Sequence, residues 1–242
     1  MRHNYFASLV FAGLFVAARL SALPTLQLDI VGGVYDPATQ TTVATSPQFT
    51  LRALLSTTSF DPAATYYISA AITPNPGYSD PDPAFGSVKI GSTTYQPSDF
   101  LYGKPPADVA DTPGSANLAS HGIYPTYYLE LAFNFDAAQK VAAYNVQDDS
   151  SAPGWLYNTD FDIDVSGLTP GFVLHFDLYN EAIKRGVLGV GDFAPFSHDA
   201  ESAHVPDSGI TIALLGLGLL GLGFASRALR TANSPRAVRL KK

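Results

Sequence analysis

The fold class is indicated most clearly by residues 127–135, Tyr127-Tyr128-Leu129-Glu130-Leu131-Ala132-Phe133-Asn134-Phe135. From residue 129 onward, large apolar side chains alternate with small or polar ones. A period of two is that of a β-strand with one buried face, because successive side chains point to opposite sides of a sheet. The stretch therefore predicts a strand with Leu129 and Leu131 toward the core and Glu130 on the other face.

The same alternation recurs elsewhere in the chain. It predicts a strand at residues 160–165, where aspartates alternate with apolar residues, and another at 174–179, where His175, Asp177 and Tyr179 share the polar face. Further strands are predicted at 26–30, 49–54, 66–72 and 87–90. Pro170, inside the Gly167–Gly171 stretch, predicts the turn of a hairpin between the strands at 160–165 and 174–179. Asp136 predicts the cap of a short helix at 137–144.

Many short strands separated by Pro, Gly, Asn and Asp clusters are typical of an all-β protein. No repeat or linker divides residues 23–204, and 46% hydrophobic residues are enough to form a core. We therefore expect a single β-sandwich over this range, jelly-roll-like or Ig-like in topology. The chain has no cysteine, so this domain uses no disulfides.

The charge is distributed unevenly along the 242 residues, whose formal net charge is −7. Residues 23–209 contain six basic residues and all 21 acidic ones, so the formal net charge of this range is 6 − 21 = −15. Such an acidic body repels phosphate backbones, so nucleic acid is not an expected partner.

The N-terminal residues 1–22 have the pattern of a secretory signal peptide. Arg2 and His3 precede an apolar run over 5–18, and Ser21 and Ala22 supply small residues before a cleavage point. This predicts export through the general secretion pathway and removal of the segment by signal peptidase. A buried N-terminal helix is the alternative.

A second apolar segment predicts a C-terminal membrane helix at 210–226. Residues 210–225 contain no charge, and a basic tail over 227–242 begins with Arg227 and Arg230, which would stop transfer and stay in the cytoplasm. Sixteen residues span roughly 24 Å as a helix, less than a hydrocarbon core of about 30 Å. The helix would thus be a weak permanent anchor.

The order of motif, apolar helix and basic tail resembles the PEP-CTERM sorting signals that exosortases process in Gram-negative bacteria. The motif here is Val205-Pro206-Asp207-Ser208-Gly209, which is similar to the VPDSG variant of that signal. The resemblance implies an exosortase-type partner, a transient stay in the inner membrane, and release to the outer envelope, cell surface or medium. An ordinary tail anchor or stop-transfer helix is the alternative.

The body resembles the choice-of-anchor N family of exported bacterial domains. The likeness is carried by LPTLQLD at 23–29, YISA at 67–70, ASHGIYPTY at 119–127, HFDLY at 175–179 and FAPFSHDAES at 193–202. The family implies surface display and no catalytic activity.

Metal sites are only weakly indicated by the sequence. The body histidines at 121, 175, 198 and 204 lack the spacing of zinc motifs, and His121, His198 and Asp199 are the best loop candidates. The aspartates at 160, 162 and 164 fail as a calcium loop, since Val165 and Gly171 stand where an EF-hand needs Gly and Glu. No cofactor is predicted, apart from structural calcium at Asp80 and Asp82 or at Asp148 and Asp149.

Catalytic motifs are missing from the sequence, which has neither G-x-S-x-G nor cysteine. Among the carboxylates, Glu130 beside Tyr128 is the candidate for a glycan hydrolase. Trp155 and the many tyrosines could instead stack on sugar rings, as in a carbohydrate-binding module. The leading hypothesis is a non-enzymatic, exosortase-sorted surface or extracellular-matrix protein associated with exopolysaccharide or biofilm. A carbohydrate-binding module is the second hypothesis, and a surface glycan hydrolase the third.

Overall fold

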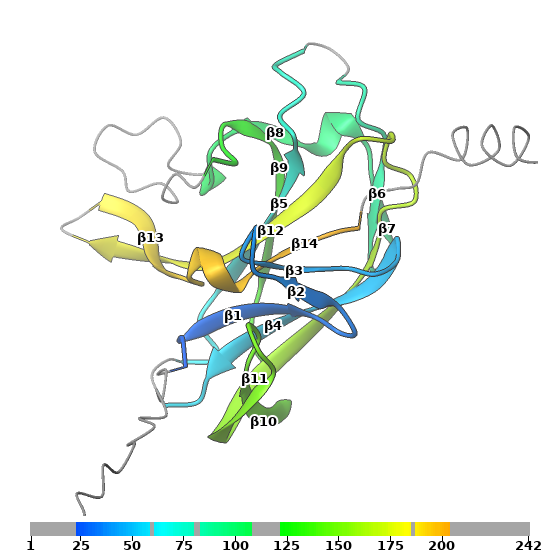
Figure 1. Cartoon of the computed structure of the whole chain (residues 1–242). Helices are drawn as coiled ribbons and strands as arrows, with labels where there is room; N and C mark the ends of the chain where they lie inside the picture. Colours follow the sequence, from blue (N-terminus) through cyan, green and yellow to red (C-terminus); the bar gives the residue numbers. More distant parts are fainter. Residues whose placement is uncertain (1–22, 59–60, 80–82, 108–121, 185–186, 204–242) are drawn as a thin grey trace, which may run out of the picture.

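The computed structural model describes residues 23–58, 61–79, 83–107, 122–184 and 187–203. These residues form two β-sheets with two short 3-10 helices, η1 (Pro97–Asp99) and η3 (Phe196–His198) (Figure 1). Within the described ranges, no helix has the length and hydrophobicity to cross a membrane. The predicted signal peptide, membrane helix and basic tail lie outside the described residues.

The first sheet has six strands. Its main path runs β1 (Leu26–Ile30), β4 (Gln48–Ser56), β11 (Ser150–Asp164), β6 (Val88–Ile90) and β7 (Thr93–Tyr95), and β10 (Lys140–Asn145) pairs with the free end of β11. The longest strand, β11, lies antiparallel to β4 over nine residue pairs, from Leu156 opposite Ser56 to Asp164 opposite Gln48. All pairings in this sheet are antiparallel.

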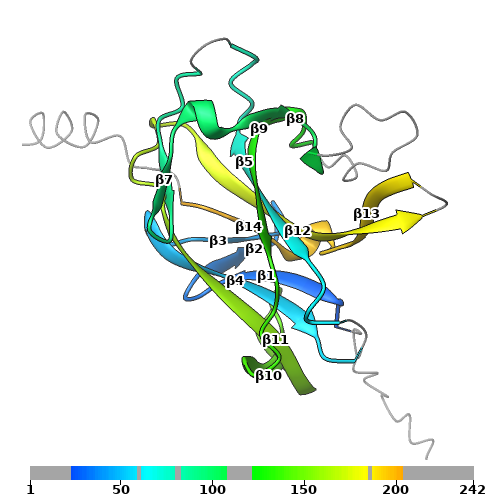
Figure 2. The ribbon, with the colours of Figure 1, turned by 180° about the vertical axis from the view of Figure 1, so that it is seen from behind.

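The second sheet has eight strands. Its order is β2 (Val34–Asp36), β3 (Thr41–Val43), β14 (Asp199–Glu201), β12 (Val173–Lys184), β5 (Tyr66–Thr73), β9 (Thr126–Phe133) and β8 (Leu101–Gly103), and β13 (Val187–Phe193) also pairs with β12. In the part of the chain that the structure describes, β14 and β3 form the one parallel pairing of this sheet. In both views β13 and the end of β12 extend away from the body as a hairpin (Figures 1 and 2).

One hydrophobic core joins the two sheets. The rings of Phe49 on β4 and Phe176 on β12 meet edge to face with centroids 6.1 Å apart, and Phe133 on β9 meets Phe161 on β11 at 5.2 Å. Leu28, Leu51 and many other side chains from both sheets are fully buried in the same cluster. The two sheets therefore form a sandwich around shared apolar side chains, as the alternation predicts.

The predicted strands are confirmed, and their alternation sorts side chains onto the expected faces. On β9, Leu129 lies in the core cluster whereas Tyr128 packs in a separate cluster on the other side of the sheet. On β12, Leu174, Phe176 and Leu178 lie in the core. On β11, Ile163 is buried, as is Val165 directly after the strand, while Asp160 and Asp162 are exposed.

Two predicted elements are wrong. The strands at 160–165 and 174–179 form no hairpin, because β11 belongs to the first sheet and β12 to the second, so residues 165–172 cross between the sheets. The predicted helix at 137–144 is a turn followed by β10. The Asp136 carboxylate accepts a hydrogen bond from the Ala138 amide at 2.8 Å, so it closes a turn, and pairing with β11 then draws the following residues into the sheet.

Candidate metal centre

Four titratable residues meet on the outer face of the second sheet, opposite the core. His175 and Asp177 are two positions apart on β12, and Asp199 and Glu201 are two positions apart on β14, so each pair shares one face. The strands are antiparallel with His175 opposite Glu201, and the same register sets Asp177 opposite Asp199. Strand pairing thus brings the two pairs of side chains together.

The distances within this cluster place His175 at its centre. Its Nε2 atom lies 3.8 Å from Asp177 Oδ1 and 3.8 Å from Asp199 Oδ2, and its Nδ1 atom lies 3.8 Å from Glu201 Oε2. One donor atom from each of His175, Asp177 and Asp199 lies within 4.8 Å of the others. Among the described residues, these three form the group of ligand-type side chains that is compact enough to surround a metal ion.

The buried position of this cluster shifts the pKa values of its titratable side chains. The side chains of His175, Asp177 and Asp199 are each at most 3% exposed. Burial by itself would lower the pKa of His175, but the surrounding carboxylates of Asp177, Glu201 and Asp199 outweigh it and raise that pKa to about 10. Burial and the neighbouring charge of Asp177 raise the pKa of Asp199 well above its usual range, although His175 opposes this shift. Both His175 and Asp199 therefore hold their protons more strongly than they would in water, since a buried carboxylate is costly unless it is paired or neutral.

A chain of hydroxyl groups fixes one of the carboxylates. The Tyr124 hydroxyl donates a hydrogen bond to Asp177 Oδ2 at 2.7 Å, and lies 2.6 Å from the Ser69 hydroxyl on β5. Burial, followed by the charge of Asp177, raises the pKa of Tyr124 well above its usual value, so the phenol remains a donor. Because Oδ2 is engaged, the other oxygen of Asp177 faces His175.

A hollow of about 400 Å³ leads to the cluster from outside. Its walls come from the turn before β3, the segment before β9 and η3, and His175, Asp199 and Glu201 also line it. The remaining lining residues are Thr39, Gln40, Thr41, Ile123 and Phe196. The hollow gives an ion or a water molecule a route to the buried side chains.

The structure places Asp199 and His198, two of the metal-binding candidates from the sequence, in different surroundings. Asp199 belongs to the cluster, whereas the neighbouring His198 faces away from it. The His198 ring nitrogens lie 3.2 Å from Asn145 Oδ1 and 3.0 Å from the Ser197 hydroxyl, and burial lowers the pKa of this histidine to about 4.

His121, Asp80 and Asp82, three further metal-binding candidates, lie outside the described residues. Asp148 caps its own turn through the Ser150 amide at 3.0 Å.

Tyr128 and Glu130, the predicted ligand-binding pair, lie on the outer face of the second sheet and contribute to its packing. Tyr128 is 2% exposed and donates a hydrogen bond to the Lys104 carbonyl at 3.3 Å. The Glu130 carboxylate accepts hydrogen bonds from the Ala107 amide at 3.1 Å and from the Tyr179 hydroxyl. These contacts give Glu130 a structural role at a half-buried position.

Trp155 lies far from that pair in the fold, on β11 of the first sheet, and is 58% exposed. It lines a hollow of about 500 Å³ together with Ser56, Thr57 and Thr58 at the end of β4. The structure therefore does not join Tyr128, Glu130 and Trp155 into one site.

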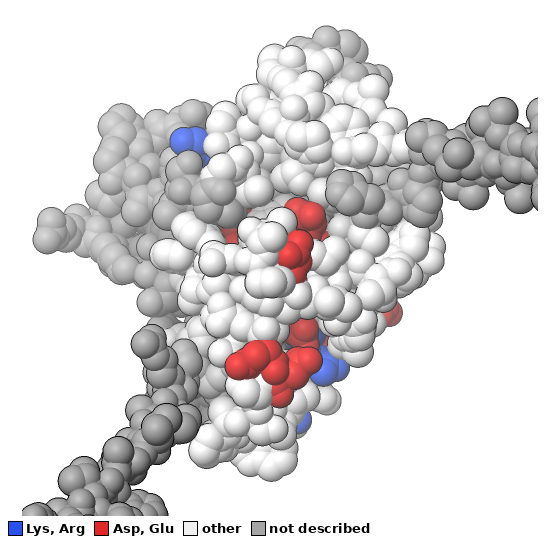
Figure 3. Space-filling view, in the orientation of Figure 1, with Lys and Arg blue, Asp and Glu red and all other residues white. Residues whose placement is uncertain are grey.

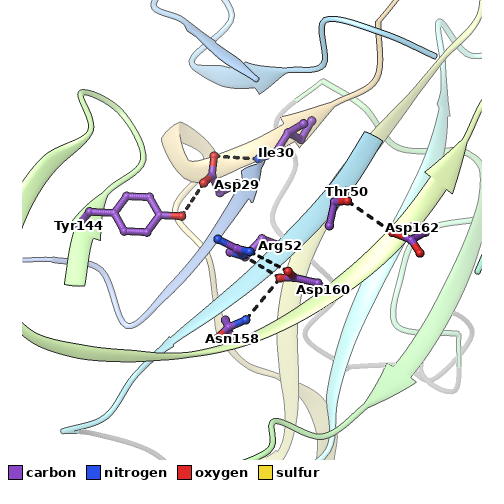
Figure 4. A network of polar contacts seen from close by, with 8 residues as sticks. All are labelled: Asp29, Ile30, Thr50, Arg52, Tyr144, Asn158, Asp160 and Asp162. Atoms are coloured by element: carbon purple, nitrogen blue, oxygen red, sulfur yellow. Dashed lines mark hydrogen bonds and ion pairs between the residues drawn. The ribbon is translucent and has the colours of Figure 1, made fainter. Parts of the chain in front are cut away.

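The outer face of the first sheet carries a separate polar network (Figure 4). Arg52 on β4 donates two hydrogen bonds to the Asp160 carboxylate on β11, at 2.8 and 2.7 Å. On the neighbouring strand, Asp29 accepts hydrogen bonds from the Tyr144 hydroxyl and from the Ile30 amide. The predicted acidic strand, within β11, therefore carries surface carboxylates, some of which are hydrogen-bonded to side chains on β4. Figure 3, in the orientation of Figure 1, shows acidic side chains gathered at several places on this side of the body, with few basic ones among them.

The sequence missed the partnership of His175 with Asp199. The alternation on β12 places His175 and Asp177 on one face, but β14 has only three residues, too few for a period of two to be recognised. Asp199 and Glu201 are two positions apart, as are His175 and Asp177, and this matching spacing was the available signal.

Comparison with known proteins identifies the sorting signal. A family model described as the VPDSG-CTERM motif matches residues 204–229, which include Val205-Pro206-Asp207-Ser208-Gly209. No curated protein and no solved structure matches the chain. The chain therefore carries a PEP-CTERM-like sorting signal, which indicates an exported protein sorted by an exosortase, and the match does not extend to the β-sandwich.

Proposed function

We propose that this protein is a non-enzymatic component of the cell surface or extracellular matrix of a Gram-negative bacterium, released from the inner membrane by an exosortase-type enzyme. The observation that carries the proposal is the VPDSG-CTERM match at 204–229, which begins directly after the last described residue of the sandwich, Ala203. A folded body followed at once by a sorting motif is the arrangement needed for a cargo that is cut free after export. The uncharged run and basic tail after the motif support a transient membrane stage.

The body is suited to display outside the cell. Its sheets close around one core without cysteine, so it needs no disulfide formation after export. The resemblance to choice-of-anchor N domains supports the same role, and the association of exosortase systems with exopolysaccharide supports a place in the matrix or biofilm.

The sorting step is tested by intact mass and cell fractionation of the native protein in host cells with and without the exosortase. We expect a mature chain that lacks residues 1–22 and the residues after the 205–209 motif, found outside the inner membrane only when the enzyme is present. Pro206→Ala should block this processing, whereas Val34→Ala, at an exposed position of the sandwich, should leave it unchanged. A chain that keeps Lys242 and stays in the inner membrane in both strains would refute the proposal.

Carbohydrate binding is the second candidate, and the setting of Trp155 favours it. An exposed indole beside hydroxyl groups offers a flat apolar face for a sugar ring and polar partners at its edge. The Thr57 hydroxyl donates to the Trp155 carbonyl at 3.0 Å and so helps to position this residue. A hydrolase centred on Glu130 is less well supported, because its carboxylate is engaged in packing contacts.

Trp155→Ala should lower retention of the protein on cellulose or on the host's own exopolysaccharide at least roughly tenfold, because a stacked aromatic ring is commonly among the few residues that carry most of a binding energy. Tyr78→Ala is the matched control, since Tyr78 is 68% exposed but lies elsewhere, against Tyr102 of β8. Equal retention of the wild-type protein and both variants would exclude a sugar site at Trp155.

A further inference from the structure

We propose that His175, Asp177 and Asp199 bind one zinc ion between strands β12 and β14. The three side chains come from segments that are adjacent only through strand pairing, and their donor atoms converge on the outer face of the second sheet. This site does not depend on the function proposed above, and it lies outside the sorting motif.

The geometry suits a small divalent cation. In a tetrahedral arrangement, donor atoms 3.8 Å apart lie roughly 2.3 Å from the ion, and donor atoms up to 4.8 Å apart lie roughly 2.9 Å from it. Zinc bonds to nitrogen and carboxylate oxygen are about 2.0–2.2 Å long, so movements of less than about 1 Å would bring the three side chains to bonding distance. Three protein ligands and an open position toward the hollow match a tetrahedral ion with a water as its fourth ligand.

The surroundings orient two of the three ligands before an ion arrives. Asp199 and Asp177 face the Nε2 side of His175, while the Glu201 carboxylate lies 3.8 Å from Nδ1 on the other side of the ring. A carboxylate behind a metal-bound imidazole is a recurring outer ligand partner, because it fixes the ring and increases the basicity of the bonding nitrogen. The Tyr124 hydroxyl donates a hydrogen bond to Asp177 Oδ2 at 2.7 Å and so fixes the orientation of that carboxylate.

The donor set favours zinc over calcium. Calcium takes six to eight oxygen ligands, often with several from backbone carbonyls. The cluster instead offers one imidazole nitrogen with two carboxylates, and imidazole suits zinc and its neighbours among the transition metals. Two positive charges would also offset the buried Asp177 and Asp199 carboxylates.

The test uses the full chain in detergent, treated with a chelator and then titrated with ZnCl₂ or CaCl₂ in a calorimeter. We expect one zinc per chain and a melting temperature that rises with zinc concentration, with weaker or no binding of calcium. Asp199→Asn and Asp177→Asn keep the side-chain shape and should weaken zinc binding at least roughly tenfold, the lower end of what the loss of even an outer partner costs. Glu130→Gln, which changes an acid on the same face of the sheet outside the cluster, should bind zinc like the wild-type protein.

X-ray absorption of the zinc-loaded wild-type protein gives a result that does not depend on whether a variant folds. One nitrogen and two or three oxygen neighbours at about 2.0–2.2 Å would agree with the proposed ligands. Zinc bound with equal affinity by wild type, Asp199→Asn and Asp177→Asn would overturn the proposal. So would tighter binding of calcium than of zinc, a zinc shell rich in nitrogen, or no zinc binding at all.

Discussion

At the residue scale, the position of a side chain on its strand decides its chemistry. His198 and Asp199 are neighbours in sequence, yet one is hydrogen-bonded to Asn145 and the other lies against His175. The difference arises because η3 ends at His198 and β14 begins at Asp199, so the chain changes direction between them. Adjacent residues that look equivalent as metal ligands thus serve different parts of the fold.

The paired charges of Arg52 and Asp160 show how exposure limits the value of such a contact. The pair is bidentate, a geometry that fixes both side chains. Hydrogen bonding from Arg52 lowers the pKa of Asp160, with burial opposing this and the charge of Arg52 adding to it. The Asp160 side chain is 37% exposed, so solvent screens the attraction and the stabilisation stays small.

Asp160→Asn should lower the free energy of unfolding by about 0.5–1 kcal/mol at pH 7. Because the pKa of Asp160 is lower in the folded state, this stabilisation is fully present above the unfolded pKa of about 3.9 and is lost as the pH falls through the folded pKa. Urea unfolding at pH 7 and pH 3 measures the change. The difference between wild type and variant should be smaller at pH 3 than at pH 7, and an equal difference at the two pH values would contradict the assigned role of the ion pair.

Asp162→Asn is the matched control for this experiment. Asp162 lies two residues along the same face of β11 and accepts a hydrogen bond from the Thr50 hydroxyl at a longer 3.4 Å. The control should therefore change the stability less than Asp160→Asn at pH 7.

At the element scale, the link between β11 and β12 determines how the two sheets are joined. Residues 165–172 leave the first sheet and enter the second, and on the way they pair with the segment before β6. The Ser87 amide donates to the Gly167 carbonyl and the Thr169 amide to the Phe85 carbonyl, both at 2.9 Å. At this contact Gly86 has a φ of +83°, and an added Cβ would lie 2.2 Å from the Gly167 carbonyl oxygen.

Gly86→Ala should therefore lower the free energy of unfolding by roughly 3 kcal/mol, since the left-handed backbone and the overlap with Gly167 both act against a side chain. Gly91→Ala is the control, because Gly91 has a φ of +58° but no atom within 4 Å of the added Cβ, so only the backbone cost of about 1 kcal/mol applies. Chemical unfolding of the two variants measures the difference. Equal losses would show that the loop does not approach Gly86 closely.

At the scale of the whole molecule, the second sheet is buried on both faces along its central strands. Ile68 and Phe176 enter the sandwich core on one side, while Ser69 and His175 on the other side are also at most 3% exposed. A cluster of Tyr124, Tyr128, Tyr179 and Ala71 covers part of this outer face, and η3 and the turn before β3 border the hollow beside it. The outer face of the second sheet thus carries a second set of buried side chains, many of them polar, in addition to the apolar core. The proposed zinc site lies among them.

Much of the fold could be predicted from alternation alone. The strand at 26–30 agrees with β1 at both ends, and β4, β5, β6, β9 and β12 cover their predicted ranges within a few residues. The three-residue strands β3, β8 and β14 were not predicted, because so few residues display a period of two only weakly, although β6 is as short and was predicted. The longer β13 was not predicted either. The turn closed by Asp136 was mistaken for a helix start because the same side-chain contact serves both structures.

The β class, the core-facing side of each long strand and the sorting motif at 205–209 could be recognised from the residues alone, because these features depend on local periodicity or on a contiguous run of residues. The placement of β11 and β12 in different sheets and the covering of the polar face of β12 required the folded chain. Alternation states which side chains share a face, but it carries no information on what packs against that face. The meeting of His175 and Asp177 with Asp199 depends on a strand pairing between residues more than twenty positions apart in the sequence, and so it emerged only with the fold.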